Sequence, residues 1–255
     1  MSGRPDLAVI LAAGRGARMM ADASTAAGLH PDQRAMARAG LKMLVPVRGR
    51  PFIAWIIDAV CQAGFGEVCV VIGPGTASVR AALAGSPVRV SFAEQVEPRG
   101  TADAVLSASS VARDRPFVVI NGDNWYPPDA LALLRAVEAP ATVGFRPAER
   151  VESFALLTVD SAGCLAELVE KPDASTRARL GSQALVSMTC WSFTSAVFAA
   201  CRAVTPSPRG ELELPDAVRH LVLSGSCVRV IPHGGPVLDL GRAADIPLIA
   251  DRFGA

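Results

Sequence analysis

The chain has 255 residues, of which 51% are hydrophobic, enough for one large α/β domain with a substantial core. Its 25 Lys and Arg residues almost balance its 24 Asp and Glu residues, which argues against a nucleic-acid partner and against binding to an anionic membrane. Any phosphate group must therefore be bound by a local site.

Short apolar runs alternate with helix-length amphipathic stretches through the first half of the chain, a pattern typical of βαβ units and a mostly parallel sheet. The run Leu7–Ala13 is too short to span a membrane and no cleavage-site pattern follows it, so it is interpreted as a strand and not as a signal peptide. Strands are expected at Leu7–Ala12, Glu67–Ile72, Val88–Phe92 and Phe117–Asn121, and helices at Phe52–Ala63, Val79–Ala84 and Ala102–Ser110.

Beyond about Ala141 the alternation becomes less regular, which predicts an antiparallel or mixed extension of the sheet. Strands are expected at Ala155–Val159, Leu165–Val169, Leu185–Phe193 and Val228–Ile231, and helices at Ser195–Arg202, Pro215–Leu223 and Arg242–Arg252. No repeat or low-complexity linker divides the sequence, so a single domain over residues 1–255 is expected.

Six cysteines are scattered through apolar segments without a Cys-x-x-Cys pair or metal-type spacing: Cys61, Cys69, Cys164, Cys190, Cys201 and Cys227. They are interpreted as buried thiols in a reducing compartment, and a cytoplasmic location is expected. The high apolar content is also compatible with a homo-oligomer.

The first strand leads into a turn rich in glycine and arginine, residues 13–18. Glycines let the backbone approach a polyphosphate closely, and Arg15 and Arg18 supply positive charge. A dinucleotide-binding fingerprint would need a third glycine where Met19 stands, and a P-loop would need Gly-Lys-Ser/Thr, so both of those sites fit badly. The alternative is an ordinary turn with exposed arginines.

Two segments give this turn a context. LAAGRGARM (residues 11–19) and LKMLVPVRGRPFIAWIIDAV (residues 41–60) resemble the opening signature of the sugar-1-phosphate nucleotidyltransferase superfamily. The motifs are most similar to those of glucose-1-phosphate thymidylyltransferases and uridylyltransferases. The resemblance implies a Rossmann-like, mostly parallel mixed sheet sandwiched by helices, the α/β fold of nucleotide-diphospho-sugar transferases, with a nucleotide-binding half (1–140) and a sugar-phosphate-binding half (141–255).

By the same resemblance, Arg18 and Lys42 contact the triphosphate, and Leu11, Ala12, Ala13, Gly14 and Gly16 form the nucleotide-binding turn. An arginine fork and a lysine point charge suit a departing pyrophosphate.

The segment EQVEPRGTADAV (residues 94–105) resembles the family's Gln-x-x-Pro-x-Gly-Thr-Ala motif, which implies a base site at Gln95, Gly100 and Thr101. A glutamine amide both donates and accepts, so Gln95 suits the N3–H and adjacent carbonyl of uracil or thymine. A surface amide before a turn is the alternative.

Two aspartates are the expected metal ligands. Asp123 follows a buried strand at its carboxyl end, where open α/β sheets bind ligands, and Asp239 lies in VLDLGRAADI, similar to the family's terminal Trp-x-Asp-Ile/Thr-Gly. Two carboxylates with substrate phosphates and water completing an octahedron are typical of Mg²⁺. The alternatives are a turn former at Asp123 and a helix cap at Asp239.

LAELVEKPDA (residues 165–174) matches the family's Glu-Lys-Pro. The resemblance implies that Glu170 binds sugar hydroxyls and that Lys171 holds the sugar phosphate. An exposed Glu-Lys pair before a proline is the alternative. A further segment, SPRGELELPDAV (residues 207–218), is similar to one near the sugar site of hexose-1-phosphate enzymes, and no catalytic role is expected for it.

The sequence departs from the family on the sugar side, where a pattern usually like Asn-x-Gly-x-Tyr appears as Ser187-Met188-Thr189-Cys190-Trp191. It also carries an alanine-rich insert between Met20 and Gly40. A short helix over Asp32–Ala39 would place Arg34 and Arg38 on one face, as a lid over the triphosphate or as a solvated helix.

These motifs together predict an enzyme with Mg²⁺ as cofactor that transfers a nucleotidyl group from dTTP or UTP to a hexose 1-phosphate and releases pyrophosphate. Arg18, Lys42, Asp123 and Lys171 are the expected catalytic residues. The alternatives are a cytidylyl- or guanylyltransferase acting on another phosphorylated alcohol, and an inactive subunit that binds nucleotide sugars.

Overall fold

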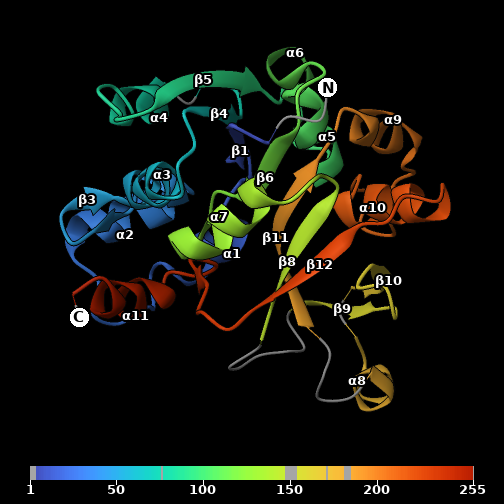
Figure 1. The fold of residues 1–255 in the computed structure, drawn as a ribbon. Coiled ribbons are helices and arrows are strands. Elements are labelled where there is room, and N and C mark those ends of the chain that lie inside the picture. Colours follow the sequence, from blue (N-terminus) through green and yellow to red (C-terminus); the bar gives the residue numbers. More distant parts are fainter. Residues whose placement is uncertain (1–3, 76, 147–153, 171, 181–184, 255) are drawn as a thin grey trace.

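A computed structural model describes residues 4–75, 77–146, 154–170, 172–180 and 185–254 (Figure 1). Four parallel strands form the first half of the central sheet, in the order β6-β1-β4-β5. They are β1 (Leu7–Leu11), β4 (Glu67–Ile72), β5 (Arg89–Glu94) and β6 (Phe117–Asn121). The apolar runs in the sequence correctly predicted all four. β1, β4 and β6 are covered on both faces and are hydrophobic along most of their length, whereas β5 is an edge strand with a shorter apolar run.

The second half of the sheet is mixed, as expected. β11 (Leu185–Phe193) runs antiparallel to β6 on one side and to β8 (Ala141–Phe145) on the other. β8 pairs in parallel with β12 (Arg229–His233), and the hairpin of β9 (Ala155–Val159) and β10 (Leu165–Val169) joins the lower part of β11. Across the described residues the sheet contains nine strands.

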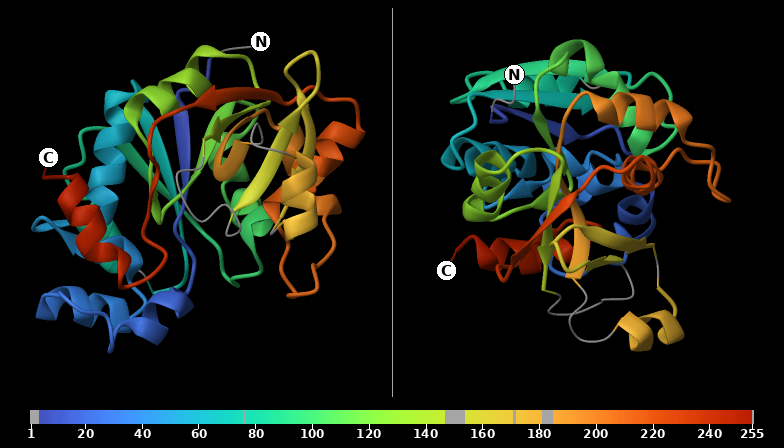
Figure 2. Two further views of the ribbon diagram at one scale, coloured as in Figure 1. Left: turned by 90° about the horizontal axis from the view of Figure 1, so that it is seen from below. Right: turned by 45° about the vertical axis from the view of Figure 1, so that its right-hand side comes forward.

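Helices cover both faces of the sheet, and each layer has its own apolar core. One core lies under α3, α7 and α11, and the other lies under α5, α9 and α10. In the left view of Figure 2, the blue and cyan helices and the closing helix lie to one side of the molecule, and the yellow and orange elements lie to the other. The helices are α1 (Ala17–Asp22), α2 (Pro31–Arg38), α3 (Phe52–Gln62), α4 (Ala77–Ala82), α5 (Thr101–Ser107), α6 (Ser109–Ala112), α7 (Pro128–Ala136), α8 (Ala174–Leu180), α9 (Ala196–Ala203), α10 (Leu214–Leu223) and α11 (Asp245–Arg252).

Small elements complete the fold at the end of the sheet where β1, β4 and β6 terminate. A 3-10 turn, η1 (Lys42–Leu44), follows the insert, and β2 (Pro46–Val47) pairs with β3 (Arg50–Pro51). Beyond β6, β7 (Asn124–Trp125) pairs antiparallel with β13 (Leu238–Asp239). None of the helices in the described ranges is long and apolar enough to cross a membrane.

The insert forms the expected helix, α2, but Arg34 does not face a ligand site. Its guanidinium donates to the carbonyl oxygens of Ala23 (2.6 Å), Ser24 (3.0 Å) and Ala26 (3.0 Å), so it anchors the segment that follows α1. Arg38 is exposed. The arrangement favours a structural role for the helix over the lid that its arginine spacing suggested.

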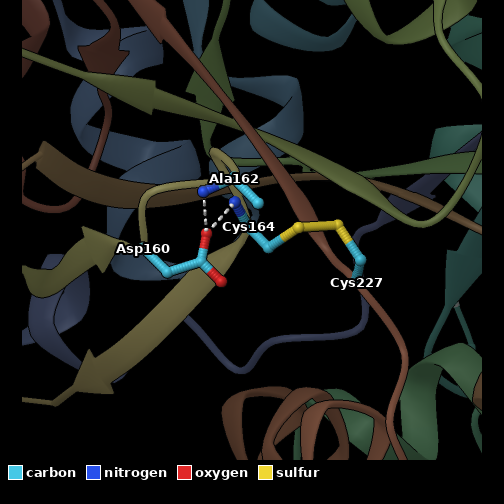
Figure 3. Close-up of a disulfide and its surroundings, with 4 residues drawn as sticks. All are labelled: Asp160, Ala162, Cys164 and Cys227. Atoms are coloured by element: carbon cyan, nitrogen blue, oxygen red, sulfur yellow. Dashed lines mark hydrogen bonds between the residues drawn. A yellow bond between two sulfur atoms is a disulfide. The ribbon is translucent and has the colours of Figure 1, made fainter.

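The prediction that all six cysteines are unpaired thiols is wrong. Cys164, in the turn between β9 and β10, forms a disulfide with Cys227, just before β12 (Figure 3), with a Cα–Cα distance of 5.3 Å. Asp160 shapes the turn by accepting from the N–H groups of Ala162 and Cys164, both at 2.9 Å. The remaining cysteines are free, so the inference of a reducing compartment loses the support of two residues.

Candidate active site

The predicted nucleotide-binding turn lies where β1 ends between its two neighbours. Ala12 N–H donates to the Val71 carbonyl of β4 (2.8 Å), and Gly122 N–H donates to the Leu11 carbonyl (2.9 Å). The backbone is therefore still bonded to both neighbouring strands at Leu11 and Ala12. Ala13 and Gly14 follow at the carboxyl edge of the sheet, where parallel sheets bind ligands.

Gly16 holds this turn against the end of the insert. Its φ is +65°, and a Cβ added there would lie 2.7 Å from the carbonyl oxygen of Gly40. Only glycine tolerates both the left-handed backbone and the contact. The packing brings the turn next to the residues that lead into η1, and Arg15 and Arg18 are both exposed.

Lys42 and Asp123 form a direct ion pair, with 2.9 Å between Nζ and Oδ2. The Lys42 side chain is only 13% exposed, and that of Asp123 is 27% exposed. The sequence predicted both residues for the site but not this contact. The ammonium group supplies the positive charge that the carboxylate needs at this partly buried position.

Asp239 lies beside Asp123 because of backbone pairing between two short strands. Asp239 is the register partner of Asn124, and Leu240 N–H donates to the Asp123 carbonyl at 2.8 Å. The Asn124 amide also donates to Asp239 Oδ1 at 3.3 Å. Residues 115 positions apart in the sequence are thus held next to each other by main-chain geometry.

The surroundings of Asp239 raise its pKa from 3.8 to about 6. Burial is the largest cause, followed by the negative charges of Asp123 and Asp245, whereas Lys42 and Arg18 act in the opposite direction. A pair of partly buried carboxylates that repel each other is stabilised by a cation between them. Asp123, Lys42 and Arg18 are therefore all close enough for their charges to act on Asp239, the first raising its pKa and the other two lowering it.

The donor set fits a hard divalent cation that also binds substrate. Within the described residues, no three or more His, Cys, Asp or Glu side chains gather as a complete metal cage. Mg²⁺ is commonly held by one or two carboxylates, with phosphate oxygens and water filling the other positions. Asp123 and Asp239 provide such a pair, so the residues present fit the expected metal.

Gln95 is buried, with 4% of its surface exposed, and both hydrogens of its side-chain amide are used within the protein. Nε2 donates to the Gly100 carbonyl (3.0 Å) and to Asp103 Oδ2 (2.9 Å). The amide is therefore oriented before any base binds. Its remaining recognition group is the oxygen Oε1, and the expectation that it also donates to a base does not match this arrangement.

Gly100 and Thr101 begin α5 in tight contact with the segment before α10. A Cβ on Gly100 would lie 2.4 Å from the Leu212 carbonyl oxygen, and its φ is +120°. Thr101 Oγ1 accepts from Leu214 N–H at 2.8 Å. The predicted base loop is thus packed directly against the segment that resembles a sugar-site motif.

Glu170 follows the end of β10 and lines a groove of about 770 Å³ beside α10. The other lining residues are residues 205–209, Glu213 and four residues of α10. Glu170 is close enough to Arg209 for its charge to raise the pKa of that guanidinium, behind the larger effect of the Glu213 hydrogen bond. Lys171, the expected sugar-phosphate lysine, lies outside the described residues.

The sequence analysis missed three supporting residues. Asp103 binds both the Gln95 amide and Arg99 (2.6 Å to Oδ1), and Asn124 binds Asp239. Tyr126 is buried beneath the site, with 1% exposure. The Arg99–Asp103 spacing of four positions in a helix start was a usable signal, whereas the roles of Asn124 and Tyr126 depend on distant parts of the chain.

Comparison with known proteins places these observations in a family. Residues 7–246 match the model for the family described as nucleotidyl transferase. The chain is 30% identical over 250 residues to a glucose-1-phosphate thymidylyltransferase of Streptomyces antibioticus, which covers 94% of the chain and 64% of that protein. Two other curated relatives are matched over 60% and 63% of their lengths, so the chain spans less than two thirds of these relatives.

Two solved structures share the fold. A UDP-glucose pyrophosphorylase complexed with UDP-glucose has a TM-score of 0.76 at 17% identity and covers 98% of both chains. An inositol-1-phosphate CTP transferase from T. maritima has a TM-score of 0.78 at 16% identity and covers 100% of this chain and 97% of its own. With the family match over nearly its whole length, the chain belongs to the nucleotidyl transferase family of sugar-1-phosphate nucleotidyltransferases.

Proposed function

We propose that this protein transfers a nucleotidyl group from dTTP or UTP to a hexose 1-phosphate, giving a nucleotide sugar and pyrophosphate. The observation that carries the proposal is the charge cluster at the carboxyl edge of the sheet. There the Lys42–Asp123 ion pair lies next to Asp239, whose pKa is raised by burial and by the charge of Asp123, against the opposing charges of Lys42 and Arg18.

The reaction is an in-line attack of a sugar phosphate oxygen on the α-phosphorus of the triphosphate, with pyrophosphate as the leaving group. The nucleophile is already an anion, so the protein needs neither a covalent intermediate nor a general base. Its residues contribute by positioning the reactants and compensating their charge. Arg18 and Lys42 bind the leaving phosphates, and Lys171 offsets the repulsion between the two anionic substrates.

Asp123 and Asp239 would hold Mg²⁺. The ion supplies neutralisation of the triphosphate charge when it is bound. Lys42, which is paired with Asp123 in this structure, lies where its ammonium would also reach a phosphate bound at that carboxylate.

Thymine or uracil is favoured over cytosine by the orientation of Gln95. With Nε2 committed to Gly100 and Asp103, Oε1 accepts from the N3–H of thymine or uracil, a donor that cytosine lacks. Glu170, beyond β10, binds hydroxyl groups of the sugar.

The test is a pyrophosphate-release assay with each nucleoside triphosphate, a panel of sugar 1-phosphates and added Mg²⁺. We expect turnover with dTTP or UTP and glucose 1-phosphate, and a fall in kcat of at least about 100-fold in Asp123→Asn, the size associated with loss of a preorganised charge. An unchanged circular dichroism spectrum would show that the variant is folded. Asp251→Asn, which changes an exposed carboxylate on α11, is the matched control. Near-normal activity of Asp123→Asn would refute the assignment.

A second candidate is transfer from CTP to another phosphorylated alcohol. It is favoured by the fold shared with the inositol-1-phosphate CTP transferase, and the same assay separates it, since CTP would then be the preferred triphosphate. A non-catalytic nucleotide-sugar-binding subunit would show a thermal shift with nucleotide sugar and no turnover with any substrate pair.

A further inference from the structure

Thr189 has a backbone conformation that its side chain disfavours. It lies within β11 with φ of +52°, in the left-handed region that β-branched residues rarely adopt. The ladder between β11 and β8 also changes register between Ser187 and Trp191, so Thr189 is in an irregular part of the strand. Such strain persists only where the surrounding structure enforces it, and it is concentrated at functional sites.

The hydroxyl of Tyr126 enforces this conformation. It contacts the carbonyl oxygens of Met188 and of Thr189, the latter at 3.1 Å, and accepts from the N–H of Asn121 at 3.4 Å. Tyr126 is the single tyrosine of the chain and is 1% exposed. One buried hydroxyl therefore fixes the irregular part of β11 to the last residue of β6.

This junction adjoins the charge cluster. Asn121 ends β6 only two residues before Asp123, and the charges of Asp123 and Asp239 both act on Tyr126, whose pKa they raise behind the larger effects of burial and Cys190. β11 belongs to the second half of the sheet, next to the hairpin that leads to Glu170. Thr189 thus lies between the proposed metal ligands and the proposed sugar side.

The Thr189 side chain is open to a ligand. Met188 and Cys190, its neighbours in sequence, are buried in the core, with 7% and 0% exposure, whereas Thr189 is partly exposed. No described residue forms a hydrogen bond with the Thr189 hydroxyl. The pattern that this segment resembles has glycine at the position of Thr189, which suits the left-handed backbone; this chain keeps the backbone and adds a hydroxyl.

We propose that Thr189 is a specificity-determining residue for the sugar phosphate and that Tyr126 is the residue that positions it. The Thr189 hydroxyl forms a hydrogen bond with a hydroxyl group of the sugar, and the buried Tyr126 hydroxyl holds the strained backbone that presents it. The inference rests on the proposed function, because it assumes a phosphorylated sugar in this part of the site.

The test compares three substitutions at one position in the steady-state assay. Thr189→Val keeps the shape and the strain but removes the hydroxyl, and we expect KM for the sugar phosphate to rise about tenfold, as for loss of one neutral hydrogen bond, with KM for the triphosphate unchanged. Thr189→Ser keeps the hydroxyl and should resemble the wild type. Thr189→Gly should lose sugar affinity as Val does while keeping a Tm at least as high as that of the wild type, since glycine relieves the strain.

Tyr126→Phe tests the positioning role. It should raise KM for the sugar phosphate and lower Tm, and its effect on Tm should shrink when residue 189 is glycine, because a glycine needs no external support in this conformation. Equal effects of Tyr126→Phe on Tm in the two backgrounds would show that the hydroxyl does not support Thr189.

Two failures are distinguishable. If the wild type turns over no substrate pair, the proposed function fails. If it turns over a sugar phosphate and both Thr189→Val and Thr189→Gly keep the wild-type KM and the wild-type preference among sugars, the proposed function stands and the role of Thr189 is refuted.

Discussion

Reduction of the Cys164–Cys227 disulfide should destabilise the protein strongly. The bond joins the turn of the β9–β10 hairpin to the segment before β12, and Cys227 is exposed, so a reductant has access to it. Two backbone hydrogen bonds accompany it, from Leu165 N–H to the Val228 carbonyl (2.8 Å) and from Val230 N–H to the Gly163 carbonyl (3.0 Å). These hydrogen bonds keep the native geometry defined after reduction, so most of the effect falls on the unfolded chain.

The magnitude follows from the length of the closed loop. The two cysteines are 63 residues apart, and the chain-entropy model gives about 4 kcal/mol at 25 °C for a loop of that size. Domains of this size lose roughly 2 to 4 °C of Tm per kcal/mol. We therefore expect a fall in Tm of roughly 10 °C. The loss of about 4 kcal/mol is a large share of a typical stability of about 5–15 kcal/mol.

Calorimetry with and without a phosphine reductant measures the shift, and thiol titration confirms the redox state. The unfolded, unreduced protein should show the four free thiols, and the reduced protein all six. In the native state Cys69 and Cys201 should not react, since burial raises their pKa values to about 11 and about 12. Cys61→Ser, which changes a free cysteine, is the control. A thiol count that rises from four to six with less than 2 °C of change in Tm would refute the reasoning.

Three further predictions concern single side chains. The folded-state pKa of Asp239 is above its unfolded value, so protonated Asp239 adds stability below pH 4, and this stability is lost as pH rises through 6. Without metal we expect a loss of about 3 kcal/mol in the free energy of unfolding, measured by denaturant titration. The loss should be smaller with Mg²⁺ and absent in Asp239→Asn. Arg34→Ala should cost about 1–3 kcal/mol of stability because it removes charged hydrogen bonds to three carbonyls, whereas exposed Arg38→Ala should stay within about 0.5 kcal/mol; equal Tm values would contradict this. Asp103→Ala should release the Gln95 amide and weaken discrimination between UTP and CTP by about tenfold. The readout is the ratio of the kcat/KM values for the two triphosphates. An unchanged ratio would show that Asp103 has no role in base selection.

The strands of the fold were largely predictable, because burial on both faces gives a strand a local signature. Glu67–Ile72, Phe117–Asn121 and Leu185–Phe193 have the predicted bounds in the structure. β8 and α7 were missed. β8 (Ala141–Phe145) contains a glycine and only five residues, and it is a strand because β11 and β12 pair with it on both sides, which no local pattern reveals.

The site was predictable in its residues and not in its contacts. Strand ends and family-like motifs indicated Asp123 and Asp239, and the structure brings them together. The ion pair from Lys42 to Asp123 spans 81 positions, and the disulfide spans 63. Pairings of this kind depend on how distant segments fold back on each other, so composition and spacing along the chain contain no direct sign of them.

Hydrogen bonds to main-chain groups hold together the segments that carry the charge cluster. The Asp123 carbonyl accepts from Leu240 N–H, which fixes the two proposed metal ligands relative to each other. Asp22, at the end of the helix that carries Arg18, accepts from Ala243 N–H at 3.1 Å, and this fixes α1 to the turn after β13. The backbone positions of Arg18, Asp123 and Asp239 are therefore fixed relative to one another before a ligand arrives.

Because these segments are already in place, little conformational entropy would be lost when a small anion binds. Such a loss is a main cost that opposes binding affinity. Arg18 is the exception, because its side chain is exposed and loses rotational freedom when it binds a phosphate. The affinity for pyrophosphate should accordingly depend on salt more through Arg18 than through Lys42, since exposed charges are screened more than buried ones. If the proposed function holds, burial gives the two residues different roles: Lys42 would define where the phosphate lies, and Arg18 would add attraction from the solvent side.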